Sequence, residues 1–271
     1  MGVGRYCNDM ISITRLSRKR LTGTLATLLA FACLGSFAMG AARAETVAGI
    51  RPVVIELFTS QGCSSCPPAD KLFAKLAHQP GVIALSLPVD LWDYVGWKDT
   101  LAAPYHAQRQ RQYAKGRGDN RVYTPQVVIN GIAHVVGSDL VAIKAQAETC
   151  FGRNGALSVR VRAEETASGL KVELGAAPDG APKTASLWLV RVASSRDVQI
   201  KRGENAGHTI TYVNVARSFQ RIGEWTGVAT SFTVPKDQVA VGDADGWMLL
   251  LQAGTTYRPG VILAAAKSPG L

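Results

Sequence analysis

The segment SQGCSSCPP (residues 60–68) places two cysteines three residues apart, directly after an apolar run and directly before two prolines. Such a pair acts as a redox catalyst, a metal clasp or a structural disulfide, depending on its surroundings. The preceding run, residues 53–58 (VVIELF), is typical of a strand buried on both faces of a parallel or mixed sheet. Residues 69–78 (ADKLFAKLAH) then repeat apolar side chains at helical spacing. The pair is therefore predicted at a helix N-terminus.

A second apolar run, residues 82–89 (VIALSLPV), predicts another buried strand. Two strands joined by a helix favour a right-handed parallel crossover, so we expect a βαβ unit with CxxC at its first turn. This combination is typical of thioredoxin-like redox proteins. Unpaired N–H groups and the helix dipole stabilise an anion at this place. We therefore expect Cys63 to react as a thiolate and Cys66 to resolve the mixed disulfide.

A hairpin is predicted at residues 126–136 (QVVINGIAHVV), because Asn-Gly between two apolar runs is the strongest short-range hairpin signal. Thr124 and Pro125 stand directly before it. Ser138 and Asp139 follow it and predict the cap of a further helix.

Residues 1–44 predict a signal peptide. A basic cluster precedes an apolar stretch at residues 21–38, and Ala-Arg-Ala at residues 42–44 has the pattern of a cleavage site. The mature chain would begin near Glu45 and be periplasmic or secreted, where disulfides persist. An uncleaved anchor is the alternative, because residues 21–38 approach the length of a membrane span. After cleavage we expect no stable membrane span.

Removing the signal peptide changes the charge balance. The whole chain has 30 Lys and Arg against 20 Asp and Glu, a formal net charge of +10, whereas the part from Glu45 onward keeps 24 against 19, or +5. The remaining excess is mild and scattered, and no nucleic-acid-binding motif accompanies it. Nucleic acid is therefore not an expected partner.

Three cysteines remain in the mature chain: Cys63, Cys66 and Cys150. A structural zinc site uses four ligands, and the histidines are scattered as single residues. We therefore assign no metal ligand and no cofactor, although a soft ion such as Cu(I) on the two paired thiols stays open. Cys150, near a predicted helix end, is expected to be a buried free thiol.

The pattern of the chain favours two domains. Residues 50–152 alternate strands and helices and contain a helical insert at about residues 90–120. Residues 155–268 consist almost entirely of strands with turns between them, a β-sandwich-like pattern that includes alternation at residues 157–162. The expected fold is an α/β domain with a mixed sheet followed by an all-β domain.

Two further features have a functional and an ordinary reading. The aromatic and basic insert could hold an extended peptide, although core packing and solvated helix faces are the usual explanation. The loop GENAGH (residues 203–208) could fold back on the cysteines, although a polar hairpin loop is the usual one. The residues of the insert are Trp92, Tyr94, Trp97, Tyr105, Tyr113, Arg109, Arg111, Lys115 and Arg117.

Four strings carry a family resemblance: VVIELFTSQGCSSCPPADKLFAKL (53–76), LPVDLWDYVGWKD (87–99), RVYTPQVVING (121–131) and GENAGHTITYVNVARSFQRIGEW (203–225). They resemble the secreted family known as domain of unknown function 1223, over nearly all of residues 52–267. The resemblance implies a thioredoxin-like domain with an added β-rich part, and it does not imply a reaction.

The resemblance also implies functional positions. It carries over Cys63, Cys66 and the Thr124-Pro125 pair, with a cis bond before Pro125. The chain departs from typical thioredoxins at Gly62, where an aromatic residue usually precedes the first cysteine, and in the Ser-Ser dipeptide between the cysteines.

Glu56 stands seven residues before Cys63, close to the place where thioredoxins keep a buried acid. It is a candidate general base if its side chain faces the cysteines. The alternative is a solvated or salt-bridged carboxylate.

Two functional hypotheses follow. The first is an exported thiol/disulfide oxidoreductase that exchanges disulfides with client proteins and with a redox partner that the sequence does not identify. Cys63 and Cys66 would react, Thr124 and Pro125 would position the client, and Glu56 would move the proton. The second is a non-catalytic binding module in which the pair is a structural disulfide or a soft-metal site.

Overall fold

The computed structural model describes residues 51–271, with the exception of residue 240. The predicted signal peptide, residues 1–44, lies outside the described residues, as does the predicted mature start at Glu45. Within the described part of the chain, no helix combines the length and the apolar character that a membrane span requires.

The predicted βαβ unit is confirmed. β1 (Val53–Thr59) leads through the cysteine segment to α1 (Pro67–Ala77), and the chain returns in β2 (Val82–Pro88). β1 and β2 are parallel, with Val53 opposite Val82. Both strands are almost wholly buried, as expected of near-continuous apolar runs.

The predicted helical insert contains a short 3-10 helix, η1 (Asp93–Val95), and one long helix, α2 (Pro104–Arg117). α2 begins with Pro104, at a position where the missing N–H has no helical partner to lose. It ends at Gly118, whose positive φ of 78° closes the last turn. Local signals therefore explain both ends of α2.

The predicted hairpin is formed by β3 (Gln126–Ile129) and β4 (Ala133–Val136). Asn130 and Gly131 between them have φ angles of 49° and 71°, a left-handed conformation that these two residue types tolerate best. The predicted helix follows as α3 (Leu140–Cys150). Asp139 caps it, because its side chain accepts a hydrogen bond from the N–H of Ala142 at 2.9 Å.

The second half of the chain is mainly strands. They are arranged along the chain with two short helices as η2 (Arg153–Gly155), β5 (Val161–Thr166), β6 (Gly169–Leu174), β7 (Ala185–Gln199), β8 (Thr209–Trp225), β9 (Thr230–Pro235), α4 (Lys236–Val239), β10 (Gly246–Thr255) and β11 (Arg258–Lys267). The strand predicted at residues 157–162 begins only at Val161. Leu157 adopts a φ of 53°, which interrupts the extended backbone before that point.

One mixed sheet runs through both halves of the chain. Its strand order is β11-β10-β7-β8-β2-β1-β3-β4. The long strand β8 joins the βαβ unit by lying parallel to β2, with Val215 opposite Ser86. The fold is therefore a mixed α/β arrangement in which late strands extend the first sheet. The division into domains at residues 152–155 stays a prediction.

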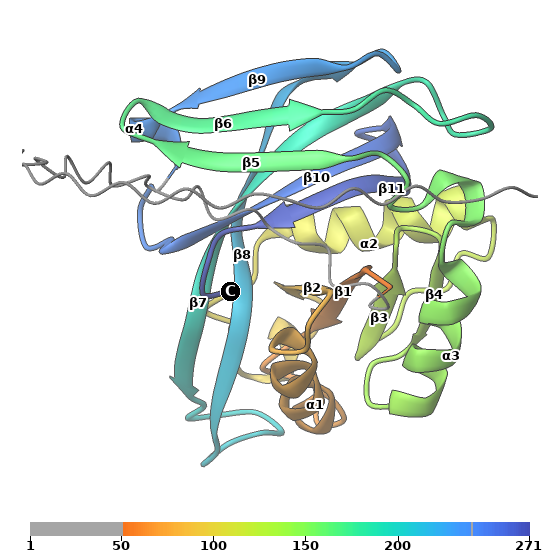
Figure 1. Cartoon of the computed structure of the whole chain (residues 1–271). Coiled ribbons are helices and arrows are strands. Elements are labelled where there is room, and N and C mark those ends of the chain that lie inside the picture. The colour runs from red at the N-terminus through yellow and green to blue at the C-terminus, as the bar shows by residue number, and fades with distance from the viewer. Residues whose placement is uncertain (1–50, 240) are drawn as a thin grey trace, which may run out of the picture. The chain divides into compact units, whose positions relative to one another are not determined.

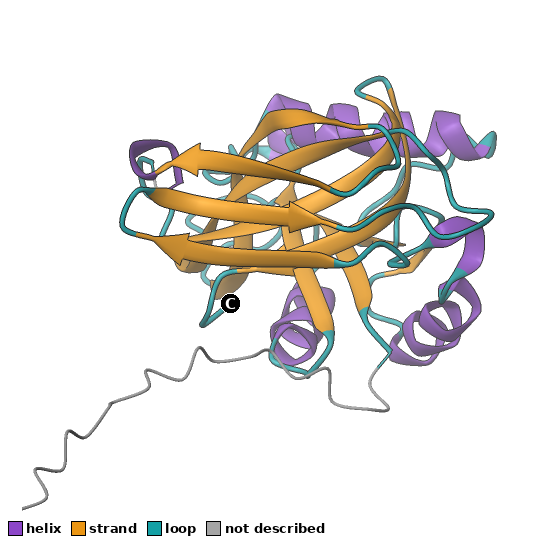
Figure 2. Cartoon of the chain, turned by 45° about the horizontal axis from the view of Figure 1, so that its top comes forward, coloured by secondary structure: helices purple, strands orange, loops and turns teal. Residues whose placement is uncertain are grey.

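A second, antiparallel sheet has the order β5-β6-β9. It packs on β7, β10 and β11 through a shared hydrophobic cluster, in which Leu170 and Val172 meet Leu187, Leu189 and Leu249. Figure 2 shows these three strands layered over the larger sheet. This layer buries the side chains of β7, β10 and β11 that face it.

Helices cover the two faces of β1 differently. Ile55 and Leu57 pack with α1 and α3, whereas Val54 and Phe58 pack with α2. Figure 1 shows α1 and α3 on one side of the sheet and α2 on the other. Because side chains alternate along a strand, Glu56 must point to the α2 side.

Candidate functional site

The two cysteines form a disulfide bond at the start of α1. Cys63 and Cys66 have Cα atoms 5.4 Å apart, and Cys66 is the N-cap residue of the helix. A tight turn leads into the bond, because the N–H of Cys63 donates to Ser60 O and the N–H of Cys66 donates to Cys63 O, each at 3.1 Å. Pro67 stands in the first helical turn, where it displaces no helical hydrogen bond. The pair therefore lies at the N-terminus of a helix, where a thiolate is favoured.

Thr124 contacts the disulfide directly. Its Oγ1 donates a hydrogen bond to Cys63 Sγ at 3.2 Å and accepts one from Trp92 Nε1 at 2.7 Å. The indole therefore orients the hydroxyl towards the sulfur. The Thr124-Pro125 peptide bond is cis. The structure brings together Cys63, Cys66, Thr124 and Pro125, four of the five residues predicted as the site.

The disulfide is covered. Cys63 is 2% exposed and Cys66 is 0% exposed. Part of the cover is Asn205, in the loop between β7 and β8, whose Nδ2 donates to the carbonyl oxygens of Gln61 and Cys63, both at 2.9 Å. Beside it, Glu204 accepts a hydrogen bond from the N–H of Ser64 at 3.3 Å. The loop GENAGH therefore folds back on the cysteine segment and is not only a polar hairpin loop.

The segment before α2 covers another side of the pair. A Cβ atom added to Gly62 would lie 2.9 Å from Trp92 Cβ and 3.0 Å from Trp92 O, so only glycine fits here without a shift. Trp97 Nε1 donates to Gln61 Oε1 at 2.8 Å. Trp92 and Trp97 of the insert therefore contact the two residues directly before Cys63.

Glu56 does not face the disulfide. Its carboxylate is 0% exposed and contacts α2, where Arg109 Nε donates to Oε1 at 2.7 Å and Tyr113 OH donates to Oε2 at 2.5 Å. The salt-bridged alternative therefore describes Glu56. As a proton-transfer residue for the cysteines it would need to lie on the α1 side of β1, and it does not.

A different acid lies beside the cysteines. Asp70 is one helical turn after Cys66 on the buried side of α1, and its N–H donates to Cys66 O at 3.1 Å. Burial raises the pKa of Asp70 to about 7; the neighbouring Thr59 side chain opposes this rise and the Asp99 charge adds to it. Among the described residues, none forms a hydrogen bond to either carboxyl oxygen. Asp70 is not among the residues predicted from the sequence. Its position four residues after Cys66 is the sequence signal that could have identified it.

Asp99 holds the backbone that leads into the cysteine turn. It accepts hydrogen bonds from the N–H groups of Gln61, Leu101 and Ala102, at 2.8, 2.9 and 3.0 Å. Burial raises the pKa of Asp99 to about 6, although these three donors lower it in part. Tyr212 OH, also buried without a partner among the described residues, has a pKa raised by burial and by the charges of Asp70 and Asp99. Asp70, Asp99 and Tyr212 therefore form a group of buried titratable side chains that influence one another.

No metal centre is evident in the described part of the chain, because no three His, Cys, Asp or Glu side chains are grouped there as ligands. Cys150 is a buried free thiol, as predicted. His106 lies in the core with Nδ1 2.7 Å from Pro88 O, and burial lowers its pKa to about 4. His134 lies 2.8 Å from Tyr123 OH and 3.1 Å from Asp119 Oδ2.

Comparison with known families decides the family of the chain. The model of a family described as "Protein of unknown function (DUF1223)" matches residues 54–252. The chain belongs to the DUF1223 family. The match includes the cysteine pair, Thr124 and Asn205, so both sides of the covered disulfide lie inside the family region of this DUF1223 protein.

Two solved structures resemble this DUF1223 protein. Protein AGR_C_4864 of Agrobacterium tumefaciens is 32% identical, with a TM-score of 0.71, over 81% of this chain and 94% of that chain. HBP35 of Porphyromonas gingivalis is 13% identical, with a TM-score of 0.51, over 80% of this chain and 74% of that chain. The second likeness concerns the fold alone.

A short match to a curated protein also exists. A probable thioredoxin of Archaeoglobus fulgidus is 47% identical to this DUF1223 protein over 38 residues. The matched part is 14% of this chain and 42% of that protein, so the comparison spans less than half of the relative's length. Together with the Cys63–Cys66 pair, it points to thiol redox chemistry.

The insert of this DUF1223 protein is divided between surface and core. Trp92 and Tyr94 stack at 6.1 Å between ring centroids, and Tyr94 is exposed. Tyr113 is buried and Tyr105 lines a separate pocket. The first part of the insert, which includes Trp92, Trp97 and Asp99, therefore lies at the cysteine site.

Proposed function

We propose that this DUF1223 protein is an exported thiol/disulfide oxidoreductase with a thioredoxin-like unit, acting on protein thiols through Cys63 and Cys66. The observation that carries the proposal is the hydrogen bond from Thr124 Oγ1 to Cys63 Sγ at the N-terminus of α1. A hydroxyl donor and a helix N-terminus both favour the charged form of a sulfur. A structural disulfide needs neither.

The reaction is a two-step exchange. A client thiolate attacks Cys63 Sγ, the bond between the two cysteines breaks, and Cys66 leaves as a thiolate. A second client thiolate then attacks the client sulfur of the mixed disulfide, and Cys63 leaves as a thiolate. Two electrons pass from the client to the cysteine pair, and the client departs as a disulfide. The same steps in reverse reduce a client disulfide.

A separate dithiol or disulfide protein restores the pair, and its reduction potential sets the direction of electron flow. In this proposal the carboxyl group of Asp70 gives a proton to Cys66 and takes it back. With a pKa of about 7, its carboxyl exchanges a proton readily at neutral pH, and it lies one turn from Cys66. In this proposal Asp70 takes the role that the sequence suggested for Glu56.

The thioredoxin-like part of the proposal rests on the βαβ unit with the cysteines at its first turn, the hairpin that follows Pro125, and the short match to a probable thioredoxin. The exported location rests on the pattern of residues 1–44 and on the preference of disulfides for oxidising compartments. The β-rich second half supplies the loop that covers the disulfide.

A second function has its own supporting observation. At 2% and 0% exposure, neither sulfur is open to a client. A binding module with a structural disulfide would look the same in this respect. Exchange therefore requires that the loop with Asn205 moves away from Cys63.

The experiment combines two measurements on the chain without residues 1–44. One is the reduction potential of the Cys63–Cys66 couple, and the other is trapping of mixed disulfides in Cys66→Ser expressed with its own signal. A catalytic pair gives a potential above about −300 mV and client adducts that Cys63→Ser/Cys66→Ser lacks. A lower potential with an unreactive Cys63 would establish a structural disulfide instead. Cys150→Ser is the matched control, because its thiol is buried elsewhere.

A further inference from the structure

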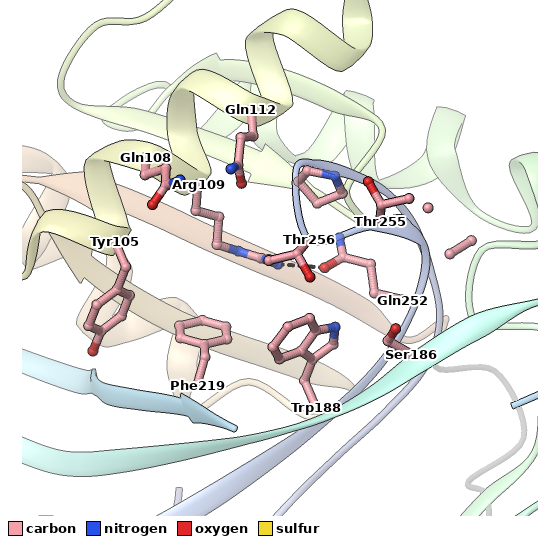
Figure 3. Close-up of a pocket in the computed structure, with 13 residues that line it drawn as sticks. Tyr105, Gln108, Arg109, Gln112, Ser186, Trp188, Phe219, Gln252, Thr255 and Thr256 are labelled. Atoms are coloured by element: carbon pink, nitrogen blue, oxygen red, sulfur yellow. Dashed lines mark hydrogen bonds between the residues drawn. The ribbon is translucent and has the colours of Figure 1, made fainter. Parts of the chain in front are cut away.

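A second concave site lies on the other face of β1, away from the disulfide. Figure 3 shows this pocket between α2 and the strands β7, β8 and β10. Its volume is about 100 Å³. On the helix side, Tyr105, Gln108, Arg109 and Gln112 occupy successive positions of one helical face.

The helix side of the pocket is polar where a helix packed on a sheet is usually apolar. Gln108 is exposed and Gln112 is partly exposed, and both line the open side of the space above the sheet. Opposite them, the aromatic rings of Trp188 and Phe219 remain only partly buried. The result is an aromatic surface in a partly enclosed space, which is typical of small-molecule sites.

Arg109 is the charged group of the pocket. Its Nε donates to Glu56 Oε1, and its Nη2 donates to Tyr113 OH at 2.7 Å and to Gln252 Oε1 at 2.9 Å. Among the residues that the structure describes, none accepts a hydrogen bond from Nη1. The side chain lines the pocket and is 12% exposed, so two N–H donors of a buried guanidinium are left for a ligand.

The surroundings of Arg109 limit the charge of that ligand. Glu56 already compensates the guanidinium, at 0% exposure. A second carboxylate would compete with Glu56, and a cation would be repelled by Arg109. The site therefore fits an uncharged molecule with a hydrogen-bond acceptor.

The shape of the pocket limits the body of the ligand. The guanidinium lies over the Phe219 ring, 5.0 Å from its centroid, and so covers that face of the ring, whereas Trp188 continues the same wall (Figure 3). A flat ring can lie against the indole of Trp188. We propose that this pocket binds a small, planar, uncharged ligand whose carbonyl oxygen accepts hydrogen bonds from Arg109 and whose ring lies against Trp188. This function is independent of the cysteine pair.

The test uses three matched probes on the whole mature chain: benzamide, benzoate and benzamidinium. The readout is the indole N–H signal of Trp188 in nitrogen-15 NMR spectra, assigned with Trp188→Phe. We expect benzamide to shift this signal saturably, with a dissociation constant on the order of 1 mM. Benzoate and benzamidinium should bind at least about tenfold more weakly, because one competes with Glu56 and the other meets Arg109.

Two variants locate the binding without disturbing the buried ion pair. Gln112→Phe places a ring at the mouth of the pocket and should abolish the benzamide shift. Arg111→Phe is its control, because Arg111 is exposed on the same helix and does not line the pocket. A missing saturable shift with benzamide, a shift that survives Gln112→Phe, or equal binding of benzoate would each overturn the proposal.

Discussion

The side-chain amide of Asn205 holds the carbonyl oxygen of Cys63 at 2.9 Å, across 142 residues of chain. The same nitrogen also donates to Gln61 O, so one amide group binds two carbonyl oxygens of the turn that carries the first cysteine. The contact connects the strand-rich second half of the chain to the chemistry of the first.

Asn205→Ala should make the disulfide more accessible to reductants. The variant leaves the carbonyl oxygen of Gln61 without its donor and removes one of the two donors to Cys63 O, which costs on the order of 1–3 kcal/mol of stability. We expect faster reduction of the disulfide by dithiothreitol, followed by quenched thiol labelling. Lys201→Ala is the control, because Lys201 is an exposed residue near the same loop. Equal reduction rates in the two variants would show that Asn205 does not limit access.

Thr124→Val tests the hydroxyl that contacts the sulfur. The valine keeps the shape of the side chain but removes the donor to Cys63 Sγ. We expect reduced Cys63 to be alkylated about tenfold more slowly at neutral pH, because the thiolate loses a hydrogen bond. Ser65→Ala, at the exposed residue whose Oγ lies 3.4 Å from the same sulfur, should have a smaller effect. An unchanged alkylation rate in Thr124→Val contradicts the proposed activation.

Asp70 should make stability depend on pH. Its pKa is about 7 in the folded chain and near its ordinary value of 3.8 when unfolded. Between these values the folded chain holds a proton that the unfolded chain has lost, so the free energy of unfolding falls as pH rises from about 4 to 7. The loss attributable to Asp70 is on the order of 4 kcal/mol. Urea unfolding should therefore find Asp70→Asn more stable than the parent at pH 8 and similar to it at pH 4.

The exposed Asp179 provides the comparison for that measurement. Asp179→Asn should follow the parent at both pH values. If Asp70→Asn also follows the parent, the carboxyl of Asp70 is not held protonated by burial.

Glu56→Gln should destabilise the chain without slowing the cysteines. It leaves the buried guanidinium of Arg109 without its counter-charge, which costs on the order of 3–5 kcal/mol. Glu148→Gln breaks the exposed pair with Arg51 and should cost less than about 1 kcal/mol. Urea unfolding measures both costs, and alkylation of reduced Cys63 in the folded variants checks the site. Slower alkylation of Cys63 in Glu56→Gln would show that Glu56 does contribute to the reactivity of the cysteine pair.

Much of the first half of the fold could be predicted from local signals. The apolar runs of β1 and β2, the helical spacing of α1, the Asn130-Gly131 turn and the cap at Asp139 each depend on neighbours within a few residues. The cysteine position followed from that order. These are the features for which short-range sequence patterns and the final structure agree.

The rest depends on contacts between distant residues. The orientation of Glu56 could not be read from VVIELF, because a strand buried on both faces has no polar side to mark the outside. Asn205 gives no local sign that its partners are Gln61 and Cys63. The pairing of β8 with β2 was not predicted either, because it depends on Ser86 meeting Val215 at long range.

The parallel contact between β8 and β2 has a consequence for how this chain tolerates being shortened. A fragment that ended after α3 would keep β1, β2 and the cysteine turn, yet β2 would become the outer strand of its sheet. A long apolar strand with unpaired backbone groups is a template for self-association. The late strands thus cover the edge of β2, and loss of the C-terminal half should produce aggregation and not a smaller folded protein.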